Sequence, residues 1–216
     1  MRVSVVIPAF NEEENVAPLH RSLSETLSRG AFVDHEIVFV DDASTDSTAA
    51  RVLALGDPRV RLVRLPRRNG QSIAQQEGFR SSRFEVIATI DGDLQQDPAD
   101  LNPMAGLLRQ GWDFVQGRRP RHAGHRILNV ARWAILDDRF TDMSCGFRLF
   151  RRQCVDSVRL FNGAHRFLPY IVQKRGFRVT EIGVRHRPRA AGRTKYRPIR
   201  LAAKVLADLL RVRFTV

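Results

Sequence analysis

The stretch "EVIATIDGDLQQDP", residues 85–98, joins a buried element to an unusual cluster of charge. Residues 86–90 are almost continuously apolar, and Asp91, Gly92 and Asp93 follow at once. A short apolar run bounded by turn residues is typical of a strand buried on both faces. Two carboxylates at the end of such a strand repel each other, so another group must make them tolerable. They can share a divalent cation, with Gly92 allowing close backbone approach; a solvated Asp-Gly-Asp turn is the alternative.

Similar apolar runs alternate with helical patterns through the first half of the chain. Strands are predicted at residues 3–9, 36–40, 60–65, 85–90 and 113–117, and helices at 13–29, 45–55, 71–82 and 98–109. Continuous apolar strands that alternate with helices indicate a mostly parallel sheet covered on both faces. The fold class is therefore α/β, an open Rossmann-like sheet sandwiched by helices.

The second half has a less regular pattern. It predicts a helix over residues 123–136, an extended segment over 145–152, a helix over 165–176, a strand over 178–189 and a helix after Pro198. The 216 residues, 43% of them hydrophobic, suffice for one large domain. Two cysteines, Cys145 and Cys154, lack metal-ligand spacing and indicate neither a disulfide framework nor a zinc site.

The net charge of +13 is concentrated in the second half of the chain. Residues 1–110 hold 12 basic and 16 acidic residues, whereas residues 111–216 hold 24 and 7. A basic half indicates phosphate-bearing partners: nucleic acid, an anionic membrane surface or a phosphorylated substrate. A solvated basic face is the alternative.

Polar loops follow three of the predicted parallel strands. They read "PAFNEEE", "DDASTDST" and "DGDLQQD", and ligands of such sheets bind in the crevice beyond the carboxyl ends of the strands. Asp42 can accept hydrogen bonds from a ribose or a base there, and Pro8 can edge a base pocket with Glu12 as acceptor. Ser44, Thr45 and Asp46 are expected instead to cap the following helix. The three loops together predict a ligand site at one edge of the sheet.

Six motifs occur in an order that resembles glycosyltransferase family 2. They are "VSVVIPAFNEEENV", "IVFVDDASTDST", "RNGQSIAQQEGF", "DGDLQQDP", "TDMSCGFRLFRR" and "HRPRAAGRTKY". Within that family the chain resembles the dolichyl- and undecaprenyl-phosphate sugar transferases, including the dolichol-phosphate mannosyltransferase type. The resemblance implies a GT-A fold, a GDP- or UDP-sugar donor and a divalent metal, Mg²⁺ or Mn²⁺. It also implies an inverting transfer of the sugar to a polyprenyl phosphate.

The resemblance assigns roles to residues of the acidic loops. Pro8, Glu12, Asp42 and Asp91 would bind the nucleotide part of the donor. Asp91 and Asp93 would hold the metal on the diphosphate, with Gln95 as a third ligand, and Asp93 is also expected to be catalytic. Where relatives often have alanine between the two aspartates, this chain has Gly92, a change between small residues that should leave metal binding intact.

The resemblance also assigns residues to the reacting groups and to the acceptor. Arg118 would lie near the phosphates, and Asp142 would position the acceptor or act as a weak base, with a purely structural role as the alternative. Because a lipid phosphate is already an anion at neutral pH, no strong base is required. The segments that match the acceptor side supply Arg148, His165, Arg166, Arg187, Arg193 and Lys195.

Three parts of the chain are predicted: a nucleotide-sugar-binding half (1–118), an acceptor-binding half of the same domain (119–196) and a C-terminal amphipathic helix (197–216). In that helix Ile199, Ala203, Leu206, Leu209 and Leu210 share one face, and Arg200, Lys204 and Arg211 share another. A basic amphipathic helix can lie on an anionic leaflet. A helix packed on the domain with a solvated basic face is the alternative.

No stretch of the sequence approaches the ~18 consecutive apolar residues of a membrane span, and the N-terminus does not resemble a signal peptide. The expected location is cytoplasmic, peripheral to the inner face of the membrane, with a separate transmembrane protein as a further partner.

Two other functions compete with this prediction. A family 2 enzyme with a saccharide or protein acceptor would keep the same donor chemistry. A nucleic-acid-binding protein would use the basic half, but it leaves the acidic loops unexplained and the chain has no helix-turn-helix or aromatic RNA-binding motif. We therefore expect no nucleic-acid partner. Neither the base nor the sugar of the donor follows from these residues.

Overall fold

The computed structural model describes residues 1–120, 132–133, 135–188 and 207–214. Its strands are β1 (Arg2–Ala9), β2 (Asp34–Asp41), β3 (Val60–Arg64), β4 (Val86–Thr89), β5 (Phe114–Arg118), β6 (Arg148–Arg151) and β7 (Val179–Gly183). Its helices are α1 (Val16–Arg29), α2 (Thr48–Leu53), α3 (Gln71–Ser81), α4 (Leu101–Arg109) and α6 (Leu168–Lys174), with 3-10 turns η1 (Pro98–Asp100), η2 (Arg152–Cys154) and η3 (Ala164–Phe167). The α/β class and the elements expected in the first half are confirmed.

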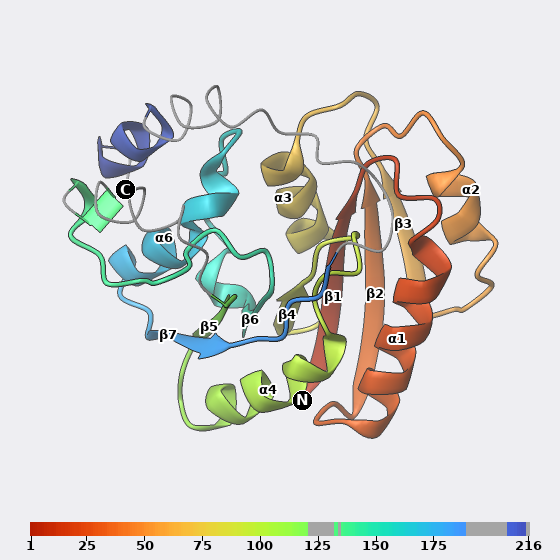
Figure 1. Cartoon of the computed structure of the whole chain (residues 1–216), viewed down its shortest axis with the longest axis horizontal. Helices are drawn as coiled ribbons and strands as arrows, with labels where there is room; N and C mark the ends of the chain where they lie inside the picture. The colour runs from red at the N-terminus through yellow and green to blue at the C-terminus, as the bar shows by residue number, and fades with distance from the viewer. Residues whose placement is uncertain (121–131, 134, 189–206, 215–216) are drawn as a thin grey trace.

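The strands of the described chain form one seven-stranded sheet in the order β3-β2-β1-β4-β6-β5-β7 (Figure 1). Strands β1 to β4 pair in parallel, so their carboxyl ends meet at one edge, which we call the rim. Strand β6 runs antiparallel between β4 and β5. Because β6 begins at the rim where β4 ends, the residues that precede β6 lie beside those that follow β4. The expected extended segment at 145–152 thus becomes an antiparallel strand of the same sheet.

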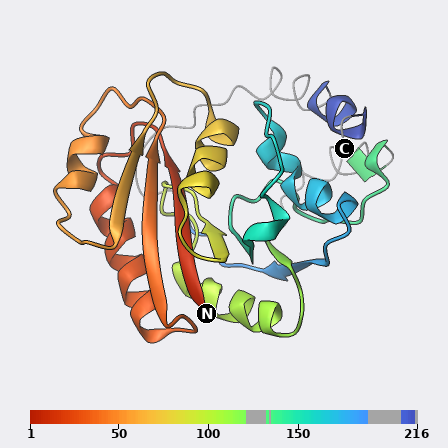
Figure 2. The same ribbon diagram turned by 180° about the vertical axis from the view of Figure 1, so that it is seen from behind.

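Alternate residues of the strands form the two cores, as the pleat requires. Val5 and Ile7 pack with α1 and α4 on one face, whereas Val6 packs with α3 and α6 on the other (Figures 1 and 2). Helix α1 buries the apolar stripe predicted for it, with Val16, Leu19, Leu23 and Leu27 at most 1% exposed. Each such side chain contributes about 1.5–3 kcal/mol when buried, so this face fixes the sheet under the rim.

The described end of the C-terminal helix, residues 207–214, packs on the domain. Leu209 and Val212 are buried in the core that α3 and α6 also enter, and the Arg211 guanidinium lies 4.2 Å from the centroid of the Phe161 ring. The expectation that Leu209 faces a membrane is therefore wrong, because hydrophobic burial against the domain takes that side chain. Leu210 and Phe214 remain 47% and 84% exposed. The other residues expected on its two faces, Ile199, Arg200, Ala203, Lys204 and Leu206, lie outside the described residues.

Two further expectations are only partly tested. The helix predicted over 123–136 falls mostly outside the described residues, of which 132, 133, 135 and 136 are helical. Across the described ranges, no helix is both long enough and apolar enough to cross a bilayer. The two halves predicted at 1–118 and 119–196 share the sheet, since β6 and β7 of the second half pair with β4 and β5 of the first.

Two helical glycines predict opposite effects of the same substitution. A Cβ on Gly78 of α3 would overlap the Val6 side chain, whereas a Cβ on Gly106 of α4 would meet nothing within 4 Å. We expect Gly106→Ala to stabilise the fold by about 0.5–1 kcal/mol through helix propensity. Gly78→Ala should destabilise it by about 1–3 kcal/mol through overpacking. Urea unfolding of both variants measures the difference, and equal effects would contradict the packing of α3 on β1.

Candidate active site

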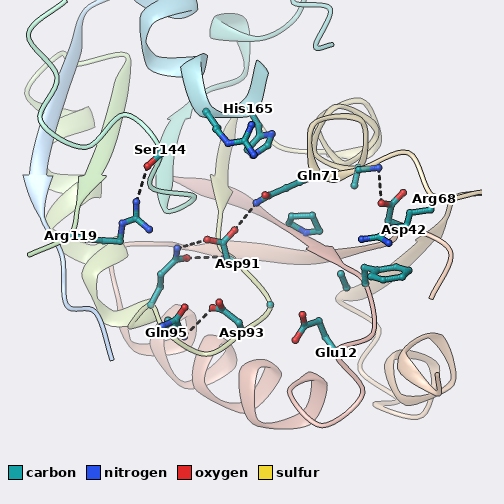
Figure 3. A pocket seen from close by; sticks show the side chains of 18 of the residues that line it. Glu12, Asp42, Arg68, Gln71, Asp91, Asp93, Gln95, Arg119, Ser144 and His165 are labelled. Carbon is teal, nitrogen blue, oxygen red and sulfur yellow. Dashed lines mark hydrogen bonds between the residues drawn. The ribbon is translucent and has the colours of Figure 1, made fainter. Parts of the chain in front are cut away.

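A cavity of about 420 Å³ opens at the rim, above the ends of β1, β2 and β4 (Figure 3). It is lined by Pro8, Ala9, Phe10, Glu12, Asp42, Arg68, Gly70, Gln71, Ala74, Asp91, Gly92, Asp93, Gln95, Gln96, Arg119, Ser144, His165, Arg166 and His186. The structure therefore brings together all of the residues predicted for the nucleotide and the metal. These side chains come from both halves of the sequence, and the antiparallel strand β6 is what joins the halves here.

Each of the three rim loops contains one non-glycine residue in the left-handed region. These residues are Asn11 (φ 54°), Ala43 (φ 57°) and Leu94 (φ 61°). Such a conformation costs on the order of 1–2 kcal/mol for a residue with a Cβ. Strain of this kind persists where the surrounding structure over-determines it, as it does at functional sites. The loops are therefore held in shapes that the chain alone would not favour.

Side-chain bonds between the first two loops supply that restraint. Ser44 Oγ accepts from the Asn11 backbone N–H at 3.0 Å, and the Asn11 Oδ1 accepts from the Thr45 N–H at 2.8 Å. The expected capping role of Ser44 and Thr45 is thus replaced by cross-links between loops. Asp46 both caps a helix and links the loops. It accepts a hydrogen bond from the N–H of Thr48 at the start of α2 and another from the N–H of Glu13 in the first loop.

The side of the cavity predicted to bind a nucleoside contains Asp42 and a pair of residues that the sequence analysis missed. Both Asp42 carboxylate oxygens accept backbone N–H bonds, from Asn69 at 2.7 Å and Gly70 at 2.8 Å. This fastens the loop that leads into α3, in which the Arg68 guanidinium stacks 3.9 Å from the centroid of the Phe10 ring. The two make a flat, cationic platform at the cavity wall. Nothing in the run "RLPRRNG" distinguishes Arg68 from its neighbouring arginines.

Asp91 is held at both carboxylate oxygens. Oδ1 accepts from Gln71 Nε2 at 2.9 Å, and Oδ2 accepts from Gln96 Nε2 at 2.7 Å (Figure 3). Burial raises the pKa of Asp91, and the nearby charge of Asp93 raises it further. The protein therefore compensates this carboxylate only in part. Gly146 packs so closely that a Cβ there would overlap both Asp91 oxygens.

The residues present fit a divalent cation. Burial and the neighbouring charge of Asp93 raise the pKa of Asp91, a cost to its ionised form that a cation would relieve, and Asp93 and Gln95 line the same cavity. The described residues contain no group of three or more His, Cys, Asp or Glu that could hold a metal ion. Mg²⁺ commonly binds one or two carboxylates and completes its shell with waters and phosphate oxygens, so this ligand set suits a metal that arrives with a diphosphate.

Gln95 lies against the strand-like segment that follows β7. Its Nε2 is 3.5 Å from His186 Nε2, and its carbonyl oxygen accepts the Arg187 N–H at 2.7 Å. His186 lines the cavity but was not among the predicted residues, although it begins the motif "HRPRAAGRTKY". The motif was recognised in the sequence, but the residues predicted from it were the basic ones, Arg187, Arg193 and Lys195.

Arg119 occupies the position that was expected of Arg118. Arg118 is exposed at the end of β5 and does not line the cavity, whereas Arg119 does. Arg119 Nε and Nη2 donate to the two oxygens of Asp142 at 2.7 and 2.9 Å. Burial alone would raise the pKa of Asp142, but these bonds hold it below its usual value. Asp142, itself absent from the lining, therefore positions Arg119.

Arg148 does not reach the cavity, so the expectation that it binds the acceptor is wrong. It is fully buried in β6, paired across the sheet with Thr89 and Gln116. Its Nε donates to Gln116 Oε1 at 2.8 Å and its Nη2 to the His165 carbonyl oxygen at 2.9 Å. Burial lowers the pKa of Arg148 to about 10. Both faces of β6 are covered by the two cores, with Leu149 in one and Phe150 in the other, and this burial explains the correction.

The remaining acceptor-side predictions divide into three groups. His165 and Arg166 line the cavity, with Arg166 Nη1 3.5 Å from Asp208 Oδ2 of the C-terminal helix. Arg187 does not line it, and its exposed guanidinium pairs with Asp97 at 2.6 Å. Arg193 and Lys195 lie outside the described residues.

The Arg119–Asp142 pair predicts a pH-dependent stability difference. We expect Asp142→Asn to destabilise the fold by about 2–4 kcal/mol near neutral pH, because it removes one partner of a largely buried ion pair. Since the folded-state pKa is lowered, the contribution is complete above the unfolded pKa of about 4 and disappears as the pH falls through the folded value. Urea unfolding between pH 3 and 7 measures it. Asp113→Asn, in the more exposed pair with Arg151, is the control and should cost under about 1 kcal/mol.

Two structures of glucosyl-3-phosphoglycerate synthase from Mycobacterium tuberculosis show the same fold. The complex with UDP has a TM-score of 0.74 at 24% identity, covering 98% of this chain and 80% of that one. The complex with Mn²⁺, UDP and phosphoglyceric acid has a TM-score of 0.76 at 22% identity, covering 99% and 78%. At these identities the likeness concerns the fold, which is the GT-A arrangement expected from the sequence.

Sequence relatives point the same way. Dodecaprenyl-phosphate galacturonate synthase of Rhizobium johnstonii is 33% identical over 232 residues, which cover 99% of this chain and 67% of that protein. Undecaprenyl-phosphate 4-deoxy-4-formamido-L-arabinose transferase of Pseudomonas fluorescens is 32% identical, with coverages of 96% and 64%. The chain thus spans about two thirds of the length of these relatives. Residues 4–159 match the family described as Glycosyl transferase family 2, and the chain therefore belongs to that family, as its six ordered motifs predict.

Proposed function

We propose that this protein is a metal-dependent, inverting glycosyltransferase that moves a sugar from a nucleotide-sugar donor to a polyprenyl phosphate. The observation that carries the proposal is the composition of the cavity. The acidic residues Asp91 and Asp93 line it together with the basic residues Arg119 and Arg166. The curated relatives support the acceptor, since both are named for a polyprenyl phosphate.

The donor would lie along the rim loops. Its nucleoside fits between the Arg68–Phe10 platform and the polar groups of Glu12 and Asp42, and its diphosphate fits above Asp93. Asp91, Asp93 and Gln95 would hold the cation, which when bound supplies a Lewis acid for the departing diphosphate. Structures of glucosyl-3-phosphoglycerate synthase in complex with Mn²⁺ and UDP agree with this chemistry.

Arg119 stabilises the charge that develops on the leaving group. Its guanidinium is fixed in orientation by the two bonds to Asp142, and a pre-oriented cation is worth more than a mobile one as charge builds up. Because Asp142 is committed to Arg119, it is poorly placed to accept a proton. This suits a phosphate acceptor, which is ionised at neutral pH and attacks the sugar from the face opposite the diphosphate.

The acceptor phosphate would enter on the side of His165 and Arg166. Both line the cavity, and Arg166 offsets the repulsion between an incoming phosphate and the donor diphosphate. A saccharide or protein acceptor would need no such charge. Nucleic-acid binding is disfavoured, because Asp91 and Asp93 lie in the same cavity as these cations.

A lipid acceptor requires a position at a membrane surface. The exposed Leu210 and Phe214 lie in the C-terminal helix beside the exposed Arg211 and Arg213. Apolar and basic side chains together favour an anionic leaflet. We propose peripheral attachment to the cytoplasmic face through this helix, with a separate transmembrane protein as the alternative anchor.

Calorimetric titration with UDP and GDP, each with and without Mn²⁺, tests the donor site. We expect one of the two nucleotides to bind in a metal-dependent way, and Asp93→Asn to weaken that binding at least tenfold, about 1.4 kcal/mol, by removing a metal ligand. Asp113→Asn should leave it unchanged. Transfer from the matching nucleotide sugars to a polyprenyl phosphate then tests the reaction. Failure of both nucleotides to bind would overturn the proposal.

Gly146→Ala predicts a loss of donor binding without a change of charge. Its Cβ would displace the Asp91 carboxylate from its bonds to Gln71 and Gln96. We expect metal-dependent nucleotide affinity to fall at least tenfold, while Gly106→Ala, in open space on α4, leaves it unchanged. Wild-type affinity in Gly146→Ala would show that Asp91 need not be held in this position.

A further inference from the structure

We propose that Ser72 holds His165 as a neutral imidazole with its proton on Nε2, and that this N–H donates to a phosphate oxygen in the cavity. The ligand part of this inference rests on the proposed function. It assigns Ser72 as a positioning residue. It also gives His165 a protonation state that excludes a general base and supports a hydrogen-bond donor.

Ser72 is the second residue of α3 and is fully buried. Its Oγ accepts the backbone N–H of Gly163 at 2.9 Å and that of His165 at 3.2 Å. The same Oγ lies 2.7 Å from His165 Nδ1. A single hydroxyl thus contacts both the backbone and the ring of the residue that it positions.

The hydroxyl has one hydrogen and two lone pairs. The two backbone N–H groups occupy the lone pairs, so the hydrogen must lie between Oγ and Nδ1. Nδ1 is therefore the acceptor, and the ring carries its proton on Nε2. An imidazolium would place a second hydrogen in the Ser72 contact and would break one of the two backbone bonds.

The backbone of His165 is held by a second contact. Arg148 Nη2 donates to the His165 carbonyl oxygen at 2.9 Å, and the side chain lines the cavity although His165 as a whole is only 8% exposed. Figure 3 shows His165 on the opposite side of Asp91 from Asp93 and Gln95. The imidazole therefore approaches the cavity from the side opposite Asp93 and Gln95.

This chemical form decides what His165 can do. It is not a general base, because its Nδ1 lone pair is bound to Ser72 and its Nε2 already carries a proton. It can donate a hydrogen bond to an anion, and such a bond is stronger than one between two neutral groups. Arg166, a cation whose guanidinium also lies 3.5 Å from Asp208, lines the cavity as well. The phosphate oxygen can belong to the acceptor or to the donor diphosphate.

Nitrogen-15 NMR of histidine-labelled protein tests the tautomer directly. The signals of His165, one of six histidines, are assigned by their loss in His165→Asn. We expect a protonated Nε2 and an unprotonated Nδ1 across the neutral range, and a mixture of tautomers in Ser72→Ala. A protonated Nδ1 in the wild type would overturn the inference, and this result is independent of any transfer activity.

Two substitutions at His165 separate the N–H donor from the rest of the side chain. His165→Asn keeps an acceptor near Ser72 but has no group at the ε position, whereas the His165→Gln amide reaches that position with an N–H. We expect His165→Asn to lower kcat/KM at least tenfold, and His165→Gln to recover most of the loss. Ser24→Ala is the matched control, since Ser24 also contacts a histidine ring, His20 Nε2 at 3.2 Å, but on α1.

The source of the phosphate follows from which constant changes. If the oxygen belongs to the acceptor, His165→Asn raises KM for polyprenyl phosphate while the calorimetric affinity for the nucleotide with Mn²⁺ stays at the wild-type value. If it belongs to the donor, that affinity falls as well. Equal losses in the Asn and Gln variants would overturn the inference while the proposed function stands. Absence of nucleotide binding in the wild type would overturn the proposed function and the phosphate assignment, leaving the tautomer to the NMR result.

Discussion

The repulsion between Asp91 and Asp93 at the end of a buried strand is the constraint on which this site depends. The chain meets it in part with groups of its own, since Gln71 and Gln96 each give an N–H to Asp91. Gln71 begins α3 and Gln96 lies in the loop after β4, so the Asp91 carboxylate also ties these two segments together. The compensation is incomplete, since burial and the charge of Asp93 keep the pKa of Asp91 raised. An incomplete charge balance is what a site needs if a cation is to bind together with its substrate.

Two arginines at and below the rim also have distinct structural roles. Arg148 is fully buried and serves the backbone of His165, whereas Arg119 is oriented toward the cavity by Asp142. Arg148 donates hydrogen bonds to neutral groups, so its contribution is to fix the conformation of the segment that contains His165. Arg119 is paired with the Asp142 carboxylate, so its contribution is a positive charge held in one orientation. Both depend on β6, whose antiparallel course places residues 142–148 beside Asp91.

Local sequence pattern predicted much of this structure, because strand burial and loop polarity are local properties. The apolar runs before Asp42 and Asp91 marked the ends of β2 and β4, and the parallel connections then brought the loops together. The choice between Arg118 and Arg119 could not be made in this way, since it depends on how β5 pairs with its neighbours. The burial of Arg148 could not be predicted either, because no local sequence pattern shows that β6 lies between β4 and β5 in the sheet. Ser72 gave no signal, as its role consists of contacts with residues about ninety positions away.

The antiparallel pairing of β6 with both β4 and β5 has a mechanical consequence. Many enzymes that join two substrates place them on separate domains and close a hinge between the two. Here the rim loops proposed to bind the donor and the strand β6 of the proposed acceptor half belong to one continuous hydrogen-bonded sheet, which resists bending within its plane. The distance between the two binding regions is therefore set when the protein folds. Access must be controlled by side chains and loops above the rim, so a change of acceptor could evolve there without disturbing the donor half.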